Sequence, residues 1–225
     1  MFFNSFAFVF VVIFFFLVLF FFALVKINLI ALAFSQIGIP NHYIFTALLV
    51  TLFGSFINIP VKKIPQEIIV QETMVRVFGF RYWIPVCKKK ETILAVNLGG
   101  AVVPVLLSVY LLIKSGIWGR AAIATALMSF VTFRLAKPVK GLGIALPAFV
   151  PPVLAALISM VTAYNNAPVV AYISGTLGTL IGADILNLKK IAHLGAPVAS
   201  IGGAGTFDGI FLNGILAVLL SAILA

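Results

Sequence analysis

Long apolar runs, separated by short polar and basic stretches, follow one another along the whole chain. A helix needs about 20 mostly apolar residues to cross the hydrocarbon core of a bilayer. Runs of about this length cover residues 5–25, 43–61, 92–113, 118–134, 143–163, 168–187 and 204–224. The pattern therefore predicts an all-α fold: a polytopic transmembrane helix bundle of about seven spans, in a single integral membrane domain over residues 1–225.

Two stretches between the runs follow other patterns. Within the loop 62–91, the sequence "QETMVRVFGFRYW" alternates apolar and polar residues around Gly79, which predicts a small β-hairpin on the cytoplasmic face. The stretch 27–40, "INLIALAFSQIGIP", is too short and polar to cross a bilayer alone. We expect it to form an interfacial or re-entrant helix that leads into the second span.

Composition supports a membrane location. Hydrophobic residues make up 63% of the chain and charged residues only 9%, whereas about a quarter of a typical soluble domain is charged. The formal net charge is +10, but the basic residues gather at the ends of the apolar runs rather than on a face interleaved with aromatic residues. This placement is typical of cytoplasmic loops and not of a nucleic-acid-binding surface. The expected partner is the lipid bilayer, and no nucleic acid.

The distribution of lysine and arginine predicts the orientation. Twelve basic residues fall in the loops after the second, fourth and sixth spans, and three fall on the opposite side. Because cytoplasmic loops are enriched in these residues, the chain is expected to be a multi-pass protein of the cell membrane. Its N-terminus would be cytoplasmic and its C-terminus outside.

Of the five acidic residues, two are aspartates, and both lie within apolar runs. Asp184 comes five residues before Lys189, which places it about 7.5 Å deeper along a helix. The negative end of the helix dipole and the low dielectric there both disfavour a charged carboxylate. An ionisable residue inside a membrane is a functional candidate by default. The alternative is a structural pairing with Lys189, Lys190 or His193.

The second aspartate, Asp208, follows "GGAG" in the first turns of the last span. A carboxylate is favoured at the positive start of a helix, so Asp208 alone needs no functional explanation. Consecutive spans are antiparallel, however, and an acid late in one meets an acid early in the next at the same depth. Two carboxylates in a poorly solvated site share a proton, as in an aspartyl protease dyad. Asp184 and Asp208 are therefore the candidate catalytic residues.

Small and polar residues elsewhere could support such a site. Glycines spaced four apart, Gly178 with Gly182 and Gly205 with Gly209, predict close packing of the last two spans. Three asparagines and one proline also fall inside predicted spans: Asn58, Asn97, Asn213 and Pro147. The asparagines could line the same cavity or only hydrogen-bond a neighbouring helix. Pro147, with the two prolines that follow it, is expected to interrupt the fifth span and free backbone carbonyls.

No metal or cofactor site is indicated. The two histidines, His42 and His193, are predicted on opposite sides of the membrane, and Cys87 is the single cysteine. These residues cannot form a shared metal site or an intrachain disulfide. We therefore expect no cofactor.

The arrangement around the two acids resembles the intramembrane aspartyl proteases of the presenilin and signal-peptide-peptidase type. That family carries Tyr-Asp at its first acid and Gly-x-Gly-Asp at its second. Here Ala183-Asp184 and Gly205-Thr206-Phe207-Asp208 stand at these positions, so the tyrosine is absent and Phe207 replaces a glycine. The family's Pro-Ala-Leu motif has its nearest counterpart in Leu146-Pro147-Ala148, which precedes both acids. The resemblance implies a protease acting on transmembrane peptides.

A second resemblance covers most of the chain. The blocks "NLGGAVVPVLLSVYLL", "GIALPAFVPPVLAAL" and "GGAGTFDGIFL" are similar to those of an uncharacterised family of prokaryotic polytopic membrane proteins, a domain of unknown function. This resemblance implies no activity.

Three functions remain open from the sequence. The first is an intramembrane aspartyl protease, and the second is a proton- or cation-coupled transporter or channel that uses the same aspartates. The third is a non-enzymatic membrane scaffold whose acids pair with nearby bases. Assembly into a homo-oligomer is compatible with each, and would relieve the small size of the chain for a transporter.

Overall fold

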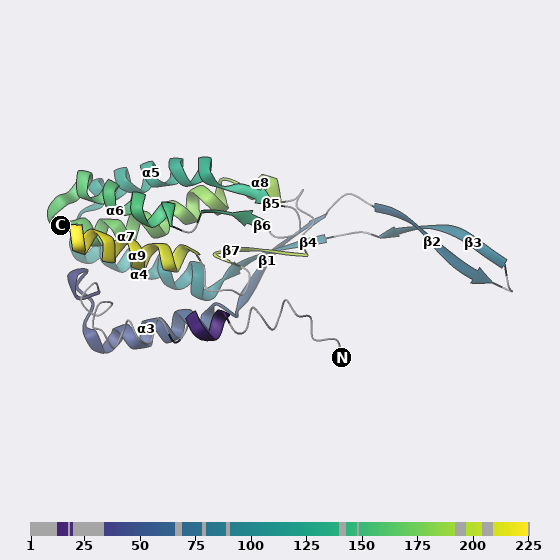
Figure 1. The fold of residues 1–225 in the computed structure, drawn as a ribbon, viewed down its shortest axis with the longest axis horizontal. Coiled ribbons are helices and arrows are strands. Elements are labelled where there is room, and N and C mark those ends of the chain that lie inside the picture. Colours follow the sequence, from purple (N-terminus) through teal and green to yellow (C-terminus); the bar gives the residue numbers. More distant parts are fainter. Residues whose placement is uncertain are drawn as a thin grey trace.

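A computed structural model shows a bundle of helices with strands extending from one end (Figure 1). The structure describes residues 13–17, 19, 34–65, 69–77, 80–88, 91–139, 143–147, 149–191, 197–203 and 209–224. The helices are α3 (Asn41–Gly54), α4 (Val103–Ser115), α5 (Trp118–Leu135), α6 (Val150–Ala163), α7 (Ala167–Thr179), the short α8 (Leu188–Ile191) and α9 (Gly209–Leu224). A 3₁₀ turn, η2 (Tyr164–Asn166), joins α6 to α7. Two π-helical turns, η1 (Leu98–Val102) and η3 (Leu180–Ile185), precede α4 and follow α7.

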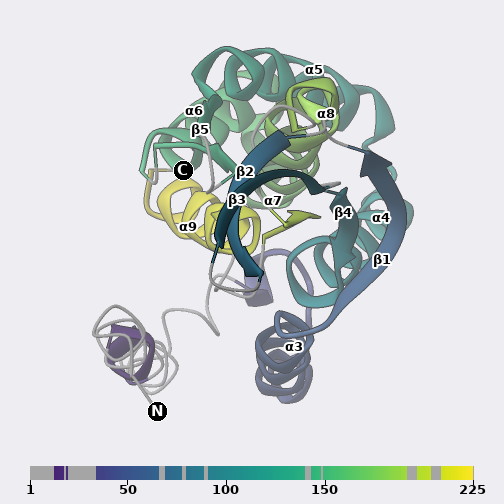
Figure 2. The same ribbon diagram turned by 90° about the vertical axis from the view of Figure 1, so that its right-hand side faces the viewer.

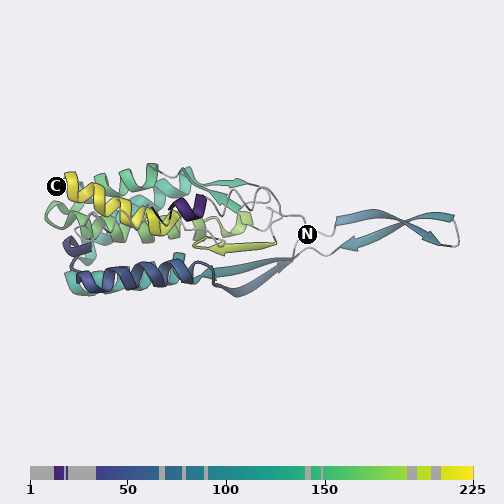
Figure 3. The same ribbon diagram turned by 60° about the horizontal axis from the view of Figure 1, so that its bottom comes forward.

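The strands form three small sheets. In the largest, β4 (Glu91–Asn97) lies between an antiparallel β1 (Asn58–Pro65) and a parallel β7 (Val198–Ile201). The strands β2 (Ile69–Val77) and β3 (Phe80–Lys88) form an antiparallel hairpin that projects from the sheet in line with the bundle (Figure 3). The third pair is β5 (Lys137–Val139) with β6 (Gly143–Ala145). The predicted hairpin is therefore confirmed, although its expected turn residue, Gly79, lies outside the described residues.

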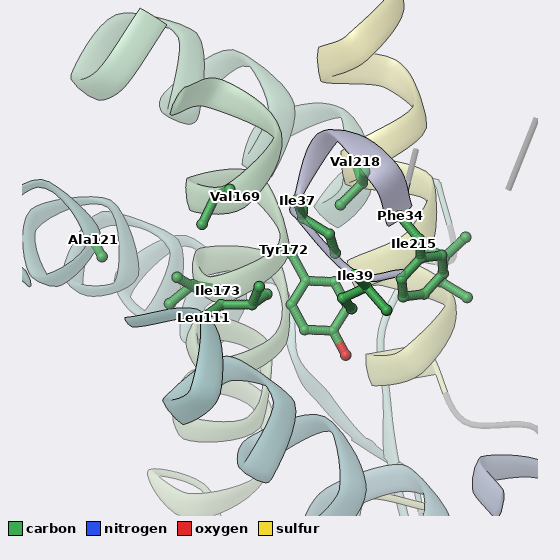
Figure 4. Close-up of a cluster of buried hydrophobic side chains, with 10 residues drawn as sticks. All are labelled: Phe34, Ile37, Ile39, Leu111, Ala121, Val169, Tyr172, Ile173, Ile215 and Val218. Atoms are coloured by element: carbon green, nitrogen blue, oxygen red, sulfur yellow. The ribbon is translucent and has the colours of Figure 1, made fainter. Parts of the chain in front are cut away.

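Helix α7 is the centre of the bundle. Viewed along the bundle, α7 is surrounded by α4, α5, α6 and α9 (Figure 2). Nearly all of its side chains are buried. Around Tyr172, side chains of α7 and of its neighbours form the largest apolar cluster among the described residues (Figure 4). It consists of Phe34, Ile37, Ile39, Leu111, Ala121, Val169, Tyr172, Ile173, Ile215 and Val218. Three of these, Phe34, Ile37 and Ile39, belong to the stretch 27–40 predicted as an interfacial or re-entrant helix, of which residues 27–33 lie outside the described residues.

The outer helices carry large apolar side chains on their surfaces, while polar side chains lie inside. Leu106 is 63% exposed, Phe130 60% and Val161 88%. Small polar residues are buried in the interior: Ser108, Thr132, Ser159, Ser174, Thr176 and Asn213. A water-soluble bundle has the opposite distribution, since its polar residues cover the surface.

The prediction of seven spans needs correction. The described residues contain two helical stretches long and apolar enough to cross a membrane, Leu98–Ser115 and Val150–Lys190, and one shorter apolar helix, Asn213–Leu224. The longer stretch turns back at Ala163 (φ −156°, ψ 61°), so α6 and α7 form an antiparallel pair. The all-α prediction fails at β1, β4 and β6, because parts of three predicted spans are strands. The first predicted span, 5–25, lies largely outside the described residues.

Prolines explain where the fifth predicted span begins. Pro151 and Pro152 are at the first turn of α6, where a missing N–H costs no intrahelical hydrogen bond. They start this helix rather than interrupting it, contrary to the prediction. Pro147 is exposed, between β6 and α6.

Basic residues gather at the sheet end of the bundle. Lys62 and Lys63 are in β1, Lys137 is in β5 and Lys189 is in α8. These elements share one end of the molecule, whereas the connection between α4 and α5 is at the other end (Figure 1). The loops after the second, fourth and sixth predicted spans were expected on one side of the membrane. In the structure, the described basic residues of these loops lie at one end of the bundle.

Candidate functional site at the sheet end of the bundle

Asp184 lies at the point where the central helix reaches the sheet. It belongs to the π-helical turn η3, in which Leu186 N–H donates to Ile181 O at 2.9 Å, five residues back. The Asp184 carboxylate is partly buried, and its Oδ2 accepts a hydrogen bond of 2.8 Å from Gly202 N–H, just beyond β7. π-helical turns inside α-helices are frequent at functional sites. The carboxylate is thus held by a backbone donor from another element.

The position of Gly202 requires glycine. Its φ is +82°, and a Cβ there would lie 2.6 Å from Ala101 Cβ and 2.8 Å from Gly100 C. Any other residue would be strained in this conformation and would collide with the turn η1. The chain therefore passes directly over η1 before its N–H reaches Asp184.

Two asparagines join the three strands of the main sheet beside this point. Asn97, which is 1% exposed, donates from Nδ2 to Ser55 O at 2.6 Å and to Asn58 Oδ1 at 3.0 Å. Its Oδ1 accepts from Gly100 N–H at 2.7 Å and so caps η1. Asn58 Oδ1 also accepts from Ser200 Oγ at 2.6 Å. This network connects the end of α3 to β1, β4 and β7. Its member on β7, Ser200, lies two residues before Gly202, whose N–H donates to Asp184.

Close backbone packing completes the junction. A Cβ on Gly99 would lie 2.0 Å from Thr51 O and 2.4 Å from Ser55 N, so η1 rests directly on the end of α3. The turn η1 is therefore fixed between α3 on one side and Gly202 on the other. We call the region formed by Ser55, Asn58, Asn97, η1, Asp184, Asn187 and residues 200–202 the junction.

Sequence reasoning missed two junction residues. Ser200 links β7 to Asn58, and Asn187 donates from Nδ2 to Gly182 O and Ala183 O, each at 3.0 Å. Asn187 is 1% exposed, and its side chain satisfies carbonyls at the end of the Asp184 helix. The available signal was its position, because a polar amide inside the apolar run "GADILNL" must find hydrogen-bond partners when buried.

Deeper in the bundle, α7 and α9 are joined by Asn213. Its Nδ2 donates to Gly175 O at 2.8 Å and to Thr179 Oγ1 at 2.5 Å. Gly175 and Gly214 allow this contact, since a Cβ at Gly214 would lie 2.6 Å from Thr176 Oγ1. The glycines predicted for this interface, Gly178 and Gly182, pack against α5 instead. A Cβ at Gly178 would meet Met128 at 2.6 Å.

The structure brings together three of the predicted site residues. Asp184, Asn58 and Asn97 meet at the junction, and Asn213 lies deeper on α9, against α7. Pro147 is exposed outside this network. Gly205 and Asp208 lie outside the described residues. Among the residues that are described, no three His, Cys, Asp or Glu side chains gather as they would around a metal ion.

These features define a helical bundle with an acidic residue held at a polar junction, beneath a small mixed sheet. The model of the family "Protein of unknown function (DUF1614)" matches residues 52–220, and the chain belongs to that family. The match includes every residue of the junction, as well as Asp208 and Asn213. The resemblance to a family of unknown function is thus confirmed. No curated protein and no solved structure matches the chain.

Proposed function

We propose that the chain is a membrane protein in which Asp184 and Asp208 form a paired acid site, and that it acts as an intramembrane aspartyl protease. The observation that carries the proposal is the contact between Asn213 and Thr179, which sets the register of α7 and α9, the helices next to the two acids in the sequence. The substrate class would be transmembrane peptides.

The membrane part of the proposal is supported by the surface of the bundle. Large apolar side chains are exposed on α4, α5 and α6 while polar ones are buried, an arrangement suited to a lipid environment. Two helical stretches have the length and composition to cross a bilayer. The basic residues at the sheet end favour a cytoplasmic position for that end. The aspartate site would then lie toward the cytoplasmic side.

The register of α7 and α9 supports a shared depth for the two acids. These helices are antiparallel and meet at Thr179 and Asn213, 2.5 Å apart. Asp184 is five residues beyond Thr179, and Asp208 is five residues before Asn213. We expect both steps to lead toward the sheet end, because α7 ends there and α9 begins there. Steps of equal length from one contact would then give the two acids similar depths. The π-helical turn η3 also favours the alignment, because residues five apart in such a turn lie near the same face.

Described residues on both sides of Asp208 belong to the surroundings of Asp184. Six residues earlier, Gly202 N–H donates to the Asp184 carboxylate. Two residues later, Ile210 packs in a cluster with Leu180 and Ala101. The segment that carries Asp208 therefore begins and ends at the junction.

A pair of carboxylates has the chemistry that peptide hydrolysis needs. One carboxylate takes a proton from a water molecule, whose oxygen adds to the peptide carbonyl carbon. The protonated partner donates its proton to the carbonyl oxygen, giving a tetrahedral intermediate. When the C–N bond breaks, a proton passes to the leaving nitrogen, so the products are a carboxylic acid and an amine. No metal or other cofactor takes part in this scheme.

The test is cleavage of transmembrane peptides by the full chain in liposomes. Single variants Asp184→Asn and Asp208→Asn should each lower the cleavage rate by about 100-fold or more, the size expected for loss of a general acid or base. Glu91→Gln, an exposed acid at the start of β4, is the matched control and should keep full activity. Cleavage that survives either aspartate change in a folded variant would exclude the protease.

A proton- or cation-coupled transporter is the second candidate. It is favoured by buried polar side chains that continue from Asp184 along the α7–α9 interface. Flux of protons or cations in liposomes that falls in Asp208→Asn, without any peptide cleavage, would establish it. The scaffold alternative required Asp184 to pair with a neighbouring base. The carboxylate is bonded to Gly202 N–H, and Lys190 Nζ lies 5.1 Å from the centre of the Phe133 ring, whereas His193 lies outside the described residues.

A further inference from the structure

A row of polar side chains runs along the interface between α7 and α9. On α7 it consists of Tyr172, Thr176 and Thr179, which are spaced four and three residues apart and so share one face of the helix. On α9 it contains Asn213. All four are at most 3% exposed. The row ends near Asp184, five residues after Thr179.

Several oxygen atoms of this row have an unmet hydrogen-bonding capacity. The Asn213 amide is oriented by its two donated bonds, to Gly175 O and Thr179 Oγ1. Its Oδ1 is buried, and among the described residues it receives no donor. The hydroxyls of Tyr172 and Thr176 have only a loose contact with each other and no hydrogen bond of normal geometry within the described part of the chain. Buried polar groups are seldom left in this state.

These oxygen atoms lie along one short stretch of α9. Gly214 follows Asn213, and a Cβ there would lie 2.6 Å from Thr176 Oγ1 and 3.0 Å from Tyr172 Cε2. The backbone of α9 therefore passes beside both α7 side chains. The Tyr172 hydroxyl points toward the end of the bundle where α9 begins (Figure 4).

We propose that the row Tyr172, Thr176 and Asn213 is a water-binding site inside the bundle. The ligand must donate to Asn213 Oδ1 and accept from the hydroxyls of Tyr172 and Thr176. A water molecule does both, and three polar partners are typical of a buried one. A cation would leave the hydroxyl protons unpaired, and the row has no carboxylate to balance its charge.

We expect the water to exchange at the end of the row nearest Asp184, five residues after Thr179. On the other side of Tyr172, the apolar cluster that includes Phe34, Ile37 and Leu111 closes the row. Water would enter and leave at the sheet end, beside the aspartate. The inference deepens the proposed protease function, because hydrolysis consumes water at that place, and it disfavours a continuous path across the bundle. Its test does not depend on catalytic activity.

The first experiment is X-ray radiolytic footprinting of the full chain in lipid nanodiscs, read by peptide mass spectrometry. Radiolysis of a bound water oxidises the side chains beside it. We expect oxidation of Tyr172 despite its burial, whereas Met128, equally buried in the apolar cluster of Ala155, Ala171 and Ala217, should stay unmodified. Tyr110 and Tyr164, which are exposed, report the reaction with bulk water. A Tyr172 as unreactive as Met128 would overturn the proposal.

The second experiment uses variants that remove the ligands of the water. Asn213→Leu and Thr176→Val should each lower the oxidation of Tyr172 several-fold without changing Tyr164. Thr176→Val keeps the shape of the side chain, so it remains informative if Asn213→Leu does not fold. It should also lower the unfolding temperature, because the water loses a partner. A rise in that temperature would contradict the site, since removing a truly unpaired hydroxyl is neutral or stabilising.

Discussion

The two faces of α7 are built differently. Toward α5, contact is close: the Thr132 hydroxyl donates to Gly178 O at 3.0 Å, and Gly182 lies directly against Ser129. On the same stripe, four residues before Gly178, the buried Ser174 hydroxyl has no hydrogen-bond partner among the described residues. Toward α9, contact is also close at Gly175 and Gly214. That face nevertheless carries buried oxygens without hydrogen-bond partners among the described residues, on Asn213, Thr176 and Tyr172.

The two faces of α7 therefore differ in how many buried oxygens lack a partner among the described residues. An interface selected only for stability has little reason to keep unpaired buried oxygens, because each one is costly. The α9 face keeps three of them, on Asn213, Thr176 and Tyr172, along the line that ends at Asp184, whereas the stripe toward α5 has one, on Ser174. Under the proposed function, the α5 face would mainly hold α7 in place and the α9 face would serve the aspartate site.

The largest effect on stability should come from the α5 face, at Gly182. In Gly182→Ala the new Cβ would fall 2.0 Å from Thr132 Oγ1 and 2.2 Å from Ser129 O. Such overpacking should destabilise the fold by about 3 kcal/mol. Thermal unfolding in detergent measures it. The control is Gly119→Ala on α5, where a Cβ meets nothing within 4 Å. If Gly182→Ala is as stable as this control, α5 does not hold α7 as described.

A smaller loss is expected when the hydrogen bond across the α5 face is removed. Thr132→Val deletes the hydroxyl that donates to Gly178 O, while keeping the shape of the side chain. Hydrogen bonds between helices in lipid contribute about 1 kcal/mol. Unfolding should therefore become easier by about that amount, and Thr132→Ser should restore most of it. Equal stability of the valine and threonine forms would remove the contrast between the faces.

The smallest effect is expected on the α9 face, at Gly175. A Cβ there would lie 3.3 Å from Ala155 Cβ on α6 and 3.5 Å from Ala217 Cβ on α9, which is tight but relieved by small shifts. The gain in helix propensity from Gly175→Ala offsets part of this strain, so stability should change by less than about 1 kcal/mol. The same unfolding assay measures it. A loss as large as that of Gly182→Ala would show that both faces are equally rigid.

Helices bounded by distinct apolar runs were predictable from the sequence. The run 118–134 corresponds to α5, Trp118–Leu135, and the run 168–187 to α7 with η3. The strands were not, because β4, "ETILAVN", continues directly into the apolar sequence of η1 and α4. A short apolar strand next to an apolar helix has no periodicity that separates the two.

The candidate site was predictable only in part. The position of Asp184 near the basic end of its helix followed from its distance to Lys189 along the chain. The junction could not be foreseen, because it depends on pairings far apart in sequence, such as Ser200 with Asn58. The side of α7 that faces α9 was also missed. Small-residue spacing indicates where helices can approach, but not which neighbour fills each face, and Gly178 and Gly182 turned out to face α5.

The central claim is that Asp184 and Asp208 face each other, and disulfide formation tests it most directly. In a Cys87→Ser background, which has no other cysteine, Asp184→Cys is combined with Asp208→Cys and the membranes are oxidised. A disulfide forms only when the two Cα atoms are within about 7 Å. Thr179→Cys with Asn213→Cys, at the observed contact between α7 and α9, is the positive control. The account predicts rapid cross-linking of both pairs, seen by peptide mass spectrometry. Cross-linking of the control pair alone would contradict it.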